Sequence, residues 1–181
     1  MLGLLVSQPV QAEPTITTTF QFYDIYPQQI KDIGPELDRH TPIRVQGRKF
    51  RGYTKWYVRW QFNWQEQPGR CYITRVQTFL TVNYTLPRIP AQHRLSPATR
   101  AVFDRYYQAL FRHEQNHKNS GLYAAREIET AITGLPAFNT CPALETAANQ
   151  LGYRLIERYA QRDRDYDRET DHGRLEGVVL P

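Results

Sequence analysis

Three stretches in the first half of the chain have the pattern of strands, and in two of them apolar and polar residues alternate with a period of two. Thr15–Tyr26 is rich in β-branched and aromatic residues, Tyr53–Trp64 carries a row of aromatic side chains on one face, and Cys71–Leu86 alternates in the same way. This period is typical of half-buried strands. Between the last two stretches, Gln65–Arg70 contains proline and glycine, which predicts a hairpin and an antiparallel pair.

The pattern between the first two strands is less regular. Ile30, Ile33 and Leu37 are spaced as in a short helix that follows Pro27, whereas His40–Gly47 holds turn residues and is expected to be a loop. The chain contains no internal repeat and no glycine-rich phosphate-binding loop.

The second half of the chain changes to helical spacing. Ser96-Pro97 supplies an N-cap followed by proline at the first helical position, and the helical period continues to about Ile132. A second helix is expected from Pro142 to Arg164, and Asp165–Pro181 shows neither period. The sequence therefore predicts an α+β fold, in which a small antiparallel sheet packs against one long helix and a second helix, with an irregular C-terminal tail.

Composition is that of one folded domain of ordinary size. The chain has 181 residues, of which 40% are hydrophobic and 13% aromatic. The net charge of +5 is a mild basic excess, and the arginines are scattered rather than clustered, so we expect no nucleic-acid partner. No stretch approaches the roughly 20 apolar residues that a transmembrane helix needs.

The start of the chain resembles part of an export signal. Residues 1–12 are apolar and end in Val10-Gln11-Ala12, which is similar to the small-residue end of a signal peptide. The stretch lacks a basic beginning and is short, so it is either the remnant of a longer signal or a disordered leader. We assign residues 1–14 to this leader and residues 15–181 to a single domain, and we expect a secreted or periplasmic protein.

The chain has two cysteines, Cys71 and Cys141. An even pair in an exported chain predicts one disulfide between the strand region and the later helices. Neither cysteine is close to the histidine motif described next, so a cysteine ligand to a metal is the weaker interpretation.

The long predicted helix contains His113-Glu114-Gln115-Asn116-His117, an H-E-x-x-H motif. Residues four apart share one helix face, so both imidazoles can bind one ion, and these two share the face that also carries apolar residues. Zinc in catalytic sites takes three protein ligands and water. We therefore predict that His113 and His117 bind Zn2+ and that Glu114 is the general base.

The third zinc ligand is not given by the motif. His172 is the preferred candidate, because it lies in a polar tail with no other evident reason to contain Asp-His-Gly. A glutamate is the alternative, and four are possible: Glu127, Glu129, Glu145 and Glu157. Tyr166, Asp167 and Asp171 are expected to hydrogen-bond a ligand or the reacting oxygen without binding zinc themselves.

These segments together resemble a bacterial family of uncharacterised domains described as predicted secreted zinc-dependent proteases. The resemblance covers nearly all of the chain after about Tyr23, and the matching residues are Tyr23-Asp24, Gly47-Arg48, Tyr53-Thr54, Trp56, Val58, Trp60, Cys71, Thr85-Leu86-Pro87, Tyr107, Leu110, His113-Glu114-Gln115, His117, Cys141, Tyr166-Asp167, Thr170, His172-Gly173 and Gly177. The chain has Asn116 where the family usually has glycine; we expect that position to point away from the metal.

The resemblance implies a secreted or periplasmic zincin-like peptidase that acts on peptide or protein substrates. The residues themselves leave two alternatives open. One is a non-catalytic envelope binding domain stabilised by zinc. The other is zinc-dependent hydrolysis of a non-peptide amide, which would use the same chemistry.

Overall fold

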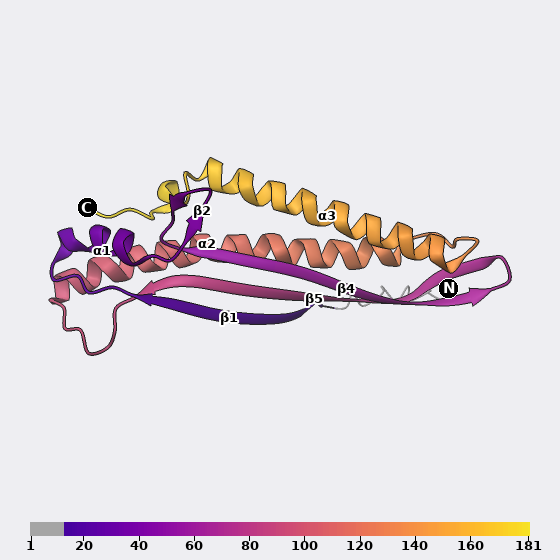
Figure 1. The fold of residues 1–181 in the computed structure, drawn as a ribbon, viewed down its shortest axis with the longest axis horizontal. Helices are drawn as coiled ribbons and strands as arrows, with labels where there is room; N and C mark the ends of the chain where they lie inside the picture. The colour runs from indigo at the N-terminus through magenta and orange to yellow at the C-terminus, as the bar shows by residue number, and fades with distance from the viewer. Residues whose placement is uncertain (1–12) are drawn as a thin grey trace, which may run out of the picture.

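The computed structural model describes residues 13–181, so all but the last two residues of the leader predicted at residues 1–14 lie outside the described residues. Figure 1 shows an elongated molecule in which two long helices run beside a narrow sheet. The helices and strands are, in chain order, β1 (Thr15–Asp24), a 3-10 turn η1 (Ile30–Asp32), α1 (Ile33–His40), β2 (Arg44–Val45), β3 (Arg48–Lys49), β4 (Tyr53–Gln67), β5 (Arg70–Arg88), α2 (Pro97–Thr133), α3 (Cys141–Glu169) and a 3-10 turn η2 (Arg174–Glu176).

The α+β class is confirmed, and so is the antiparallel pairing of β4 with β5. The sheet has the order β1-β5-β4, and β1 pairs with β5 in parallel, from Thr15 opposite Phe79 to Asp24 opposite Arg88. The sheet is therefore mixed rather than wholly antiparallel. The reason is that β5 enters between β1 and β4: it runs antiparallel to β4, which begins at the end of the sheet where β1 ends.

Two tryptophans of β4 hold α3 against the sheet. Trp56 and Trp60 are half-buried, and their indole N–H groups donate to Asp163 Oδ2 at 3.1 Å and to Asn149 Oδ1 at 3.0 Å on α3. A Cβ atom at Gly152 of α3 would lie 2.5 Å from the Trp60 ring, so glycine permits this close approach. The aromatic row of β4 is therefore the surface on which α3 packs, except at Trp64, which is 42% exposed.

Helix α2 begins as the sequence predicts. Ser96 is its N-cap, with Oγ accepting from the backbone N–H of Thr99 at 3.2 Å, and proline follows at the first helical position. Its inward face includes Tyr106, Leu110 and Ile128, all of which are buried. No helix among residues 13–181 combines the length and the apolar character needed to cross a membrane.

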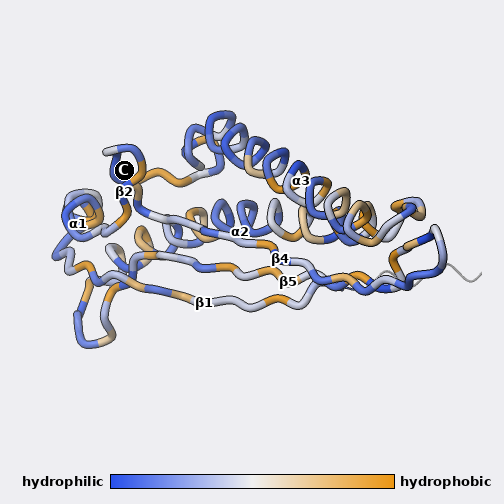
Figure 2. Tube along the Cα trace, turned by 45° about the vertical axis from the view of Figure 1, so that its right-hand side comes forward, coloured by the Kyte–Doolittle hydropathy of each residue, from blue (hydrophilic) through white to orange (hydrophobic). Residues whose placement is uncertain are grey.

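Helix α3 is longer than predicted. It continues past Arg164 to Glu169, so Tyr166 and Asp167 lie on its last turns and not in an irregular tail. The hydrophobic period fades there, as the change to blue along the C-terminal half of α3 shows in Figure 2. That half is stabilised by polar contacts on its own surface, such as the 2.7 Å bond from Gln161 to Asp165.

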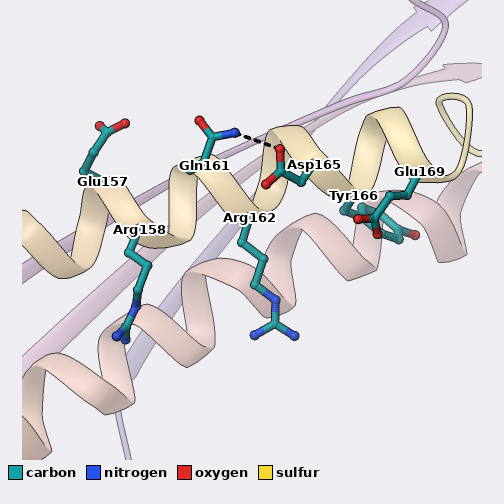
Figure 3. A pocket seen from close by; sticks show the side chains of 7 residues that line it. All are labelled: Glu157, Arg158, Gln161, Arg162, Asp165, Tyr166 and Glu169. Atoms are coloured by element: carbon teal, nitrogen blue, oxygen red, sulfur yellow. Dashed lines mark hydrogen bonds between the residues drawn. The ribbon is translucent and has the colours of Figure 1, made fainter.

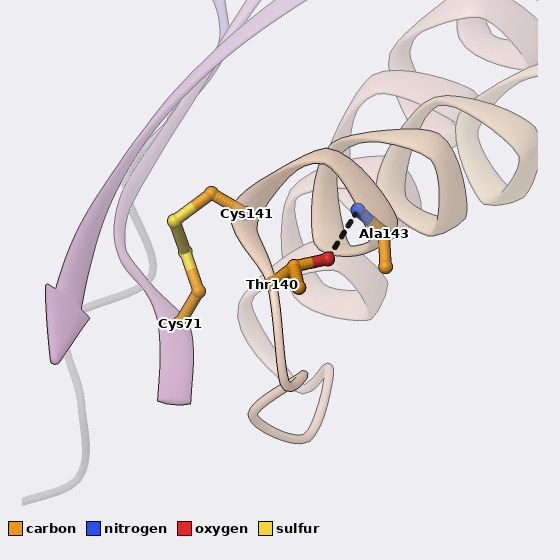
Figure 4. Close-up of a disulfide and its surroundings, with 4 residues drawn as sticks. All are labelled: Cys71, Thr140, Cys141 and Ala143. Atoms are coloured by element: carbon orange, nitrogen blue, oxygen red, sulfur yellow. Dashed lines mark hydrogen bonds between the residues drawn. A yellow bond between two sulfur atoms is a disulfide. The ribbon is translucent and has the colours of Figure 1, made fainter. Parts of the chain in front are cut away.

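The predicted disulfide is confirmed: Cys71 and Cys141 are joined across 70 residues of chain. Figure 4 shows the bond at the N-terminus of α3, beside the N-cap Thr140, whose hydroxyl accepts from the Ala143 N–H at 3.4 Å. Backbone hydrogen bonds between Cys71 and Phe138 of 2.7 and 2.8 Å flank it. The start of α3 is thereby fixed to the start of β5.

The segment expected to be a loop contains a small hairpin. Strands β2 and β3 pair antiparallel, with Val45 opposite Arg48. The two residues between them, Gln46 and Gly47, have φ values of 48° and 79°. Positive φ at both positions is what a two-residue type I′ turn requires. The turn residues therefore form this hairpin although the segment itself has few apolar side chains.

Candidate metal centre

The two histidines of the H-E-x-x-H motif lie one turn apart on the inward face of α2. His113 and His117 are 3% and 7% exposed. Their rings are nearly perpendicular, and their Nε2 atoms lie 3.2 Å apart. The motif therefore forms a buried pair of imidazoles that face the same point.

Asp167 supplies a third atom at that point. Its Oδ1 lies 3.1 Å from Nε2 of His113 and 3.1 Å from Nε2 of His117. The three atoms form a nearly equilateral triangle. A tetrahedral zinc ion with metal–ligand distances of about 2.0–2.1 Å would hold its ligand atoms about 3.3–3.4 Å apart. Two imidazole nitrogens and a carboxylate oxygen at this spacing fit a zinc ion.

A carboxylate lies behind each histidine. His117 Nδ1 is 3.0 Å from Asp163 Oδ1, and His113 Nδ1 is 2.8 Å from Glu176 Oε2. Metal-binding histidines usually donate their second ring N–H to such a group, which fixes the tautomer and leaves the other nitrogen free. With both Nδ1 atoms protonated, the three atoms that converge offer only lone pairs, and a cation between them removes this conflict.

The charges of these groups reinforce one another. Burial lowers the pKa of His117, but hydrogen bonds to Asp163 and Asp167 outweigh burial and raise that pKa to about 10. Burial raises the pKa of Asp167, yet the bonds from both histidines hold it below its usual range. The cluster therefore favours positive charge at its centre.

Tyr166 covers one side of the pair. Its ring stacks on His113 with centroids 5.0 Å apart, and its hydroxyl donates to Glu176 Oε2 at 2.7 Å. Asn116 Nδ2 donates to the same hydroxyl at 2.8 Å. The predicted neighbour Tyr166 is thus in place, and Asn116 helps to orient it.

Glu114 is not one of the three converging residues, but it interacts electrostatically with all three and is 3% exposed. Thr54 Oγ1, at the start of β4, donates to Glu114 Oε2 at 2.6 Å. Burial raises the pKa of Glu114. A Cβ atom at Gly52 would lie 2.6 Å from Glu114 Oε1, so only glycine lets the chain pass this close to the carboxylate.

The Asp-His-Gly turn follows α3 and packs on the site. Asp171, His172 and Gly173 have φ values of 50°, 50° and 81°. Non-glycine residues rarely adopt this conformation, which costs about 1–2 kcal/mol each. A Cβ atom at Gly173 would lie 2.9 Å from His113 Cγ, so the turn packs directly against the imidazole ring of His113.

The structure favours Asp167 over His172 as the third ligand. The set of ligand atoms that lie within 4.8 Å of one another consists of His113, His117 and Asp167. His172 lies outside it, with Nδ1 3.5 Å from Asp167 Oδ1 and its ring 5.0 Å from that of Phe50. The role predicted for His172 stays a prediction that the geometry does not favour.

The remaining predicted residues lie elsewhere. Asp171 pairs with Arg174 at the surface. The four alternative glutamates are also outside the converging set; three of them have other partners: Glu127 bonds with Arg158, Glu129 with Thr78 and Glu157 with Arg164.

Two residues of the site, Asp163 and Glu176, were not predicted from the sequence. Asp163 and Asp167 are four apart on α3, the same spacing as the two histidines on α2. An extension of the α3 prediction by one and a half turns would have placed both carboxylates on one face. Glu176 has no such signal, because a strained turn carries it back to His113.

An open hollow of about 710 Å³ lies along one flank of α3, where Arg158 and Arg162 reach toward α2 (Figure 3). Its lining is mostly charged and consists of Glu157, Arg158, Gln161, Arg162, Asp165, Tyr166 and Glu169. Tyr166 is the one residue that it shares with the histidine cluster. The hollow therefore borders the histidine cluster but does not contain the three converging ligand atoms.

An α+β fold with two histidines and an aspartate converging between its long helices defines a candidate metal-binding protein. The chain belongs to a bacterial family of proteins of unknown function (DUF922), whose sequence pattern it matches over residues 20–173. This range includes both histidines, Asp167 and His172. No curated protein matches the chain, and no solved structure does.

Proposed function

We propose that this protein is a zinc-dependent metallopeptidase that acts outside the cytoplasm. The observation that carries the proposal is the triangle of Nε2, Nε2 and Oδ1 atoms, with edges of 3.2, 3.1 and 3.1 Å, at an H-E-x-x-H motif. His113, His117 and Asp167 would hold the ion. When bound, zinc supplies Lewis-acid activation of water and of the scissile carbonyl group.

The residues around the triangle have separate tasks. Asp163 and Glu176 keep the Nδ1 atoms of the histidines protonated, so that both Nε2 lone pairs face inward. Three protein ligands leave the further position that a catalytic site needs. The burial of both histidines limits the access of bulk water to the ligand atoms.

Glu114 is the proposed general base. Its carboxylate accepts a proton from the attacking water and later delivers it to the leaving amine, so that one peptide bond and one water become a carboxylic acid and an amine. The hydroxyl of Thr54 holds one carboxylate oxygen, Oε2. The other oxygen, Oε1, faces the backbone at Gly52.

Two further features support export. The disulfide between Cys71 and Cys141 is typical of proteins that fold in oxidising compartments. The apolar residues before Glu13 agree with an export signal in the sequence.

A second candidate function is that of an envelope binding domain in which zinc is structural. The observation that favours it is the burial of Glu114, which is 3% exposed and accepts from Thr54 as a structural carboxylate would. In this case the ion would hold α2 and α3 together and no bond would be cleaved.

The variant Glu114→Gln separates the two candidates. Zinc content should stay near one ion per chain, because Glu114 is outside the ligand set. Cleavage of a mixed denatured-protein substrate should fall by about 10²–10⁴-fold, since an amide cannot accept the proton. Metal analysis and a chelator-controlled cleavage assay measure both quantities.

The matched control is Glu66→Gln, the same chemical change at an exposed position at the far end of β4. It should cleave like the wild type. Full chelator-sensitive cleavage by Glu114→Gln would show that Glu114 is not the base. A zinc-loaded wild type that never cleaves would favour the binding domain.

A further inference from the structure

The β2–β3 hairpin stands beside the metal centre. The chain leaves β3 at Lys49 and reaches Gly52, which touches Glu114, three residues later. Between them, the Phe50 ring lies 5.0 Å from the ring of His172. The hairpin therefore flanks both the proposed base and the turn that packs on His113.

The hairpin is exposed and firmly based. All six residues from Arg44 to Lys49 are exposed. At its base, the hydroxyl of Thr41 donates to the carbonyl of Phe50, and the Phe50 N–H donates to the Ile43 carbonyl at 3.5 Å. The two-residue turn fixes the tip. A short, anchored projection of this kind presents its side chains in a defined place.

Two of its cationic side chains, Arg44 and Lys49, donate to backbone carbonyls. Arg44 Nη1 donates to the backbone carbonyls of Thr41 and Ile43, both at 2.9 Å. Lys49 Nζ donates to the backbone carbonyl of Asp38 at 2.9 Å. These bonds orient the side chains and leave their positive charges available.

The third cation, Arg48, lies over the ring of Phe50 at 5.9 Å. The nearest acidic side chains are already engaged. Asp38 forms a two-point ion pair with Arg51 at 2.8 and 2.9 Å, and Asp171 pairs with Arg174. Lys49 and Arg48 still attract Asp38 and Asp171 electrostatically. Among residues 13–181, however, the ion pairs of these two carboxylates are with Arg51 and Arg174 and not with the three hairpin cations.

Carboxyl groups surround the metal centre and outnumber the two positive charges of the proposed zinc ion. Four carboxylates, Glu114, Asp163, Asp167 and Glu176, lie in or directly around it. A substrate with acidic residues would be repelled by these groups unless cations nearby offset them. The hairpin cations lie on the side of Glu114 and His172, where they can do this.

We propose that the β2–β3 hairpin binds an acidic stretch of the substrate, so that the enzyme selects peptides with aspartate or glutamate to one side of the cleaved bond. This inference rests on the proposed function and names its substrate class. Arginine forks match carboxylates in two-point contacts, and rim cations of this kind act on association and on salt dependence.

The test uses the full chain with zinc and the Glu114→Gln change, so that peptides are bound and not cleaved. Two labelled twelve-residue peptides are compared by fluorescence anisotropy: one contains four aspartate or glutamate residues, and the other has asparagine or glutamine in their places. The acidic peptide should bind about tenfold more tightly at low salt. The preference should fade at 1 M salt, where the Debye length is about 3 Å.

The double change Arg48→Glu with Lys49→Glu should abolish the preference. The matched control is Arg70→Glu with Arg75→Glu at the other end of the β4–β5 hairpin. It makes the same change in net charge about 33–46 Å away along β4 and should keep the preference. The melting temperatures of both variants show whether the fold is intact, and the milder Arg48→Gln with Lys49→Gln should give a partial loss.

Three results would overturn the inference: equal affinity for the two peptides, a preference that survives in the hairpin variant, or a hairpin variant that changes only binding to anionic phospholipid vesicles. Cleavage by the unmutated chain is measured separately. If the hairpin-dependent preference is found but neither peptide is cleaved, the peptidase proposal fails and the hairpin inference stands.

Discussion

The two ends of helix α3 are held by different chemistry. At the N-terminal end, the Cys71–Cys141 disulfide and the fully buried Leu144 fix the helix to the sheet. At the C-terminal end, Asp163 and Asp167 reach the histidines of α2. The contacts at the first end need no group from outside the chain. The second end brings lone pairs of nitrogen and oxygen atoms together, and their repulsion is relieved only by protons or a cation between them.

The difference separates scaffold from function. Covalent and apolar contacts stabilise the N-terminal end of α3 in an oxidising compartment, whether or not metal is present. The proposed zinc ion would stabilise the polar end by mass action on the folded state. We therefore expect changes at the two ends to act on different measurements, and three predictions test that separation.

The largest effect is expected from Asp167→Ala. The change removes one of three proposed zinc ligands, and because changes to outer partners already cost about 10–100-fold, we expect zinc affinity to fall by about 1000-fold or more. Competition with a chromophoric chelator measures it. The comparison variant His172→Ala should retain zinc within about tenfold, since His172 lies outside the converging set. If His172→Ala lost much more zinc affinity than Asp167→Ala, His172 would be the third ligand.

The next effect is expected at the other end. Replacing both Cys71 and Cys141 with serine should lower the free energy of unfolding by about 2–5 kcal/mol, measured by denaturant titration with zinc present. The cysteine end and Asp163 are about 33 Å apart along α3, so zinc affinity should change by no more than about twofold. A large loss of zinc in this variant would show that the two ends are coupled.

The smallest effect is expected from the outer carboxylates. Asp163→Asn and Glu176→Gln each leave the three ligands in place but weaken the orientation of one histidine, so zinc affinity should fall by about 10–100-fold. Asp163 also accepts from the Trp56 indole at 3.1 Å. Trp56→Phe is the control: it removes that bond and part of the ring while Asp163 stays in place, and it should leave zinc affinity nearly unchanged. Unchanged affinity in both carboxylate variants would mean that His113 and His117 are oriented by packing alone.

The sequence by itself determined the parts that depend on local periodicity. The alternating pattern predicted β4 and β5 as an antiparallel pair, and Ser96-Pro97 predicted the start of α2. The spacing of His113 and His117 placed both on one face, because four residues make about one helical turn. The even cysteine count predicted the disulfide.

Only the tertiary structure decided how these pieces meet. The parallel position of β1 follows from the insertion of β5, which no local pattern records. Asp167 joins the histidines because α3 continues through a stretch with no apolar period. Contacts with α2 and β4 stabilise the helix there, and no local pattern in the sequence indicates them. Glu176 reaches His113 through two strained residues, Asp171 and His172. Local rules cannot foresee a conformation that is unfavourable by itself and is stabilised only by what it touches.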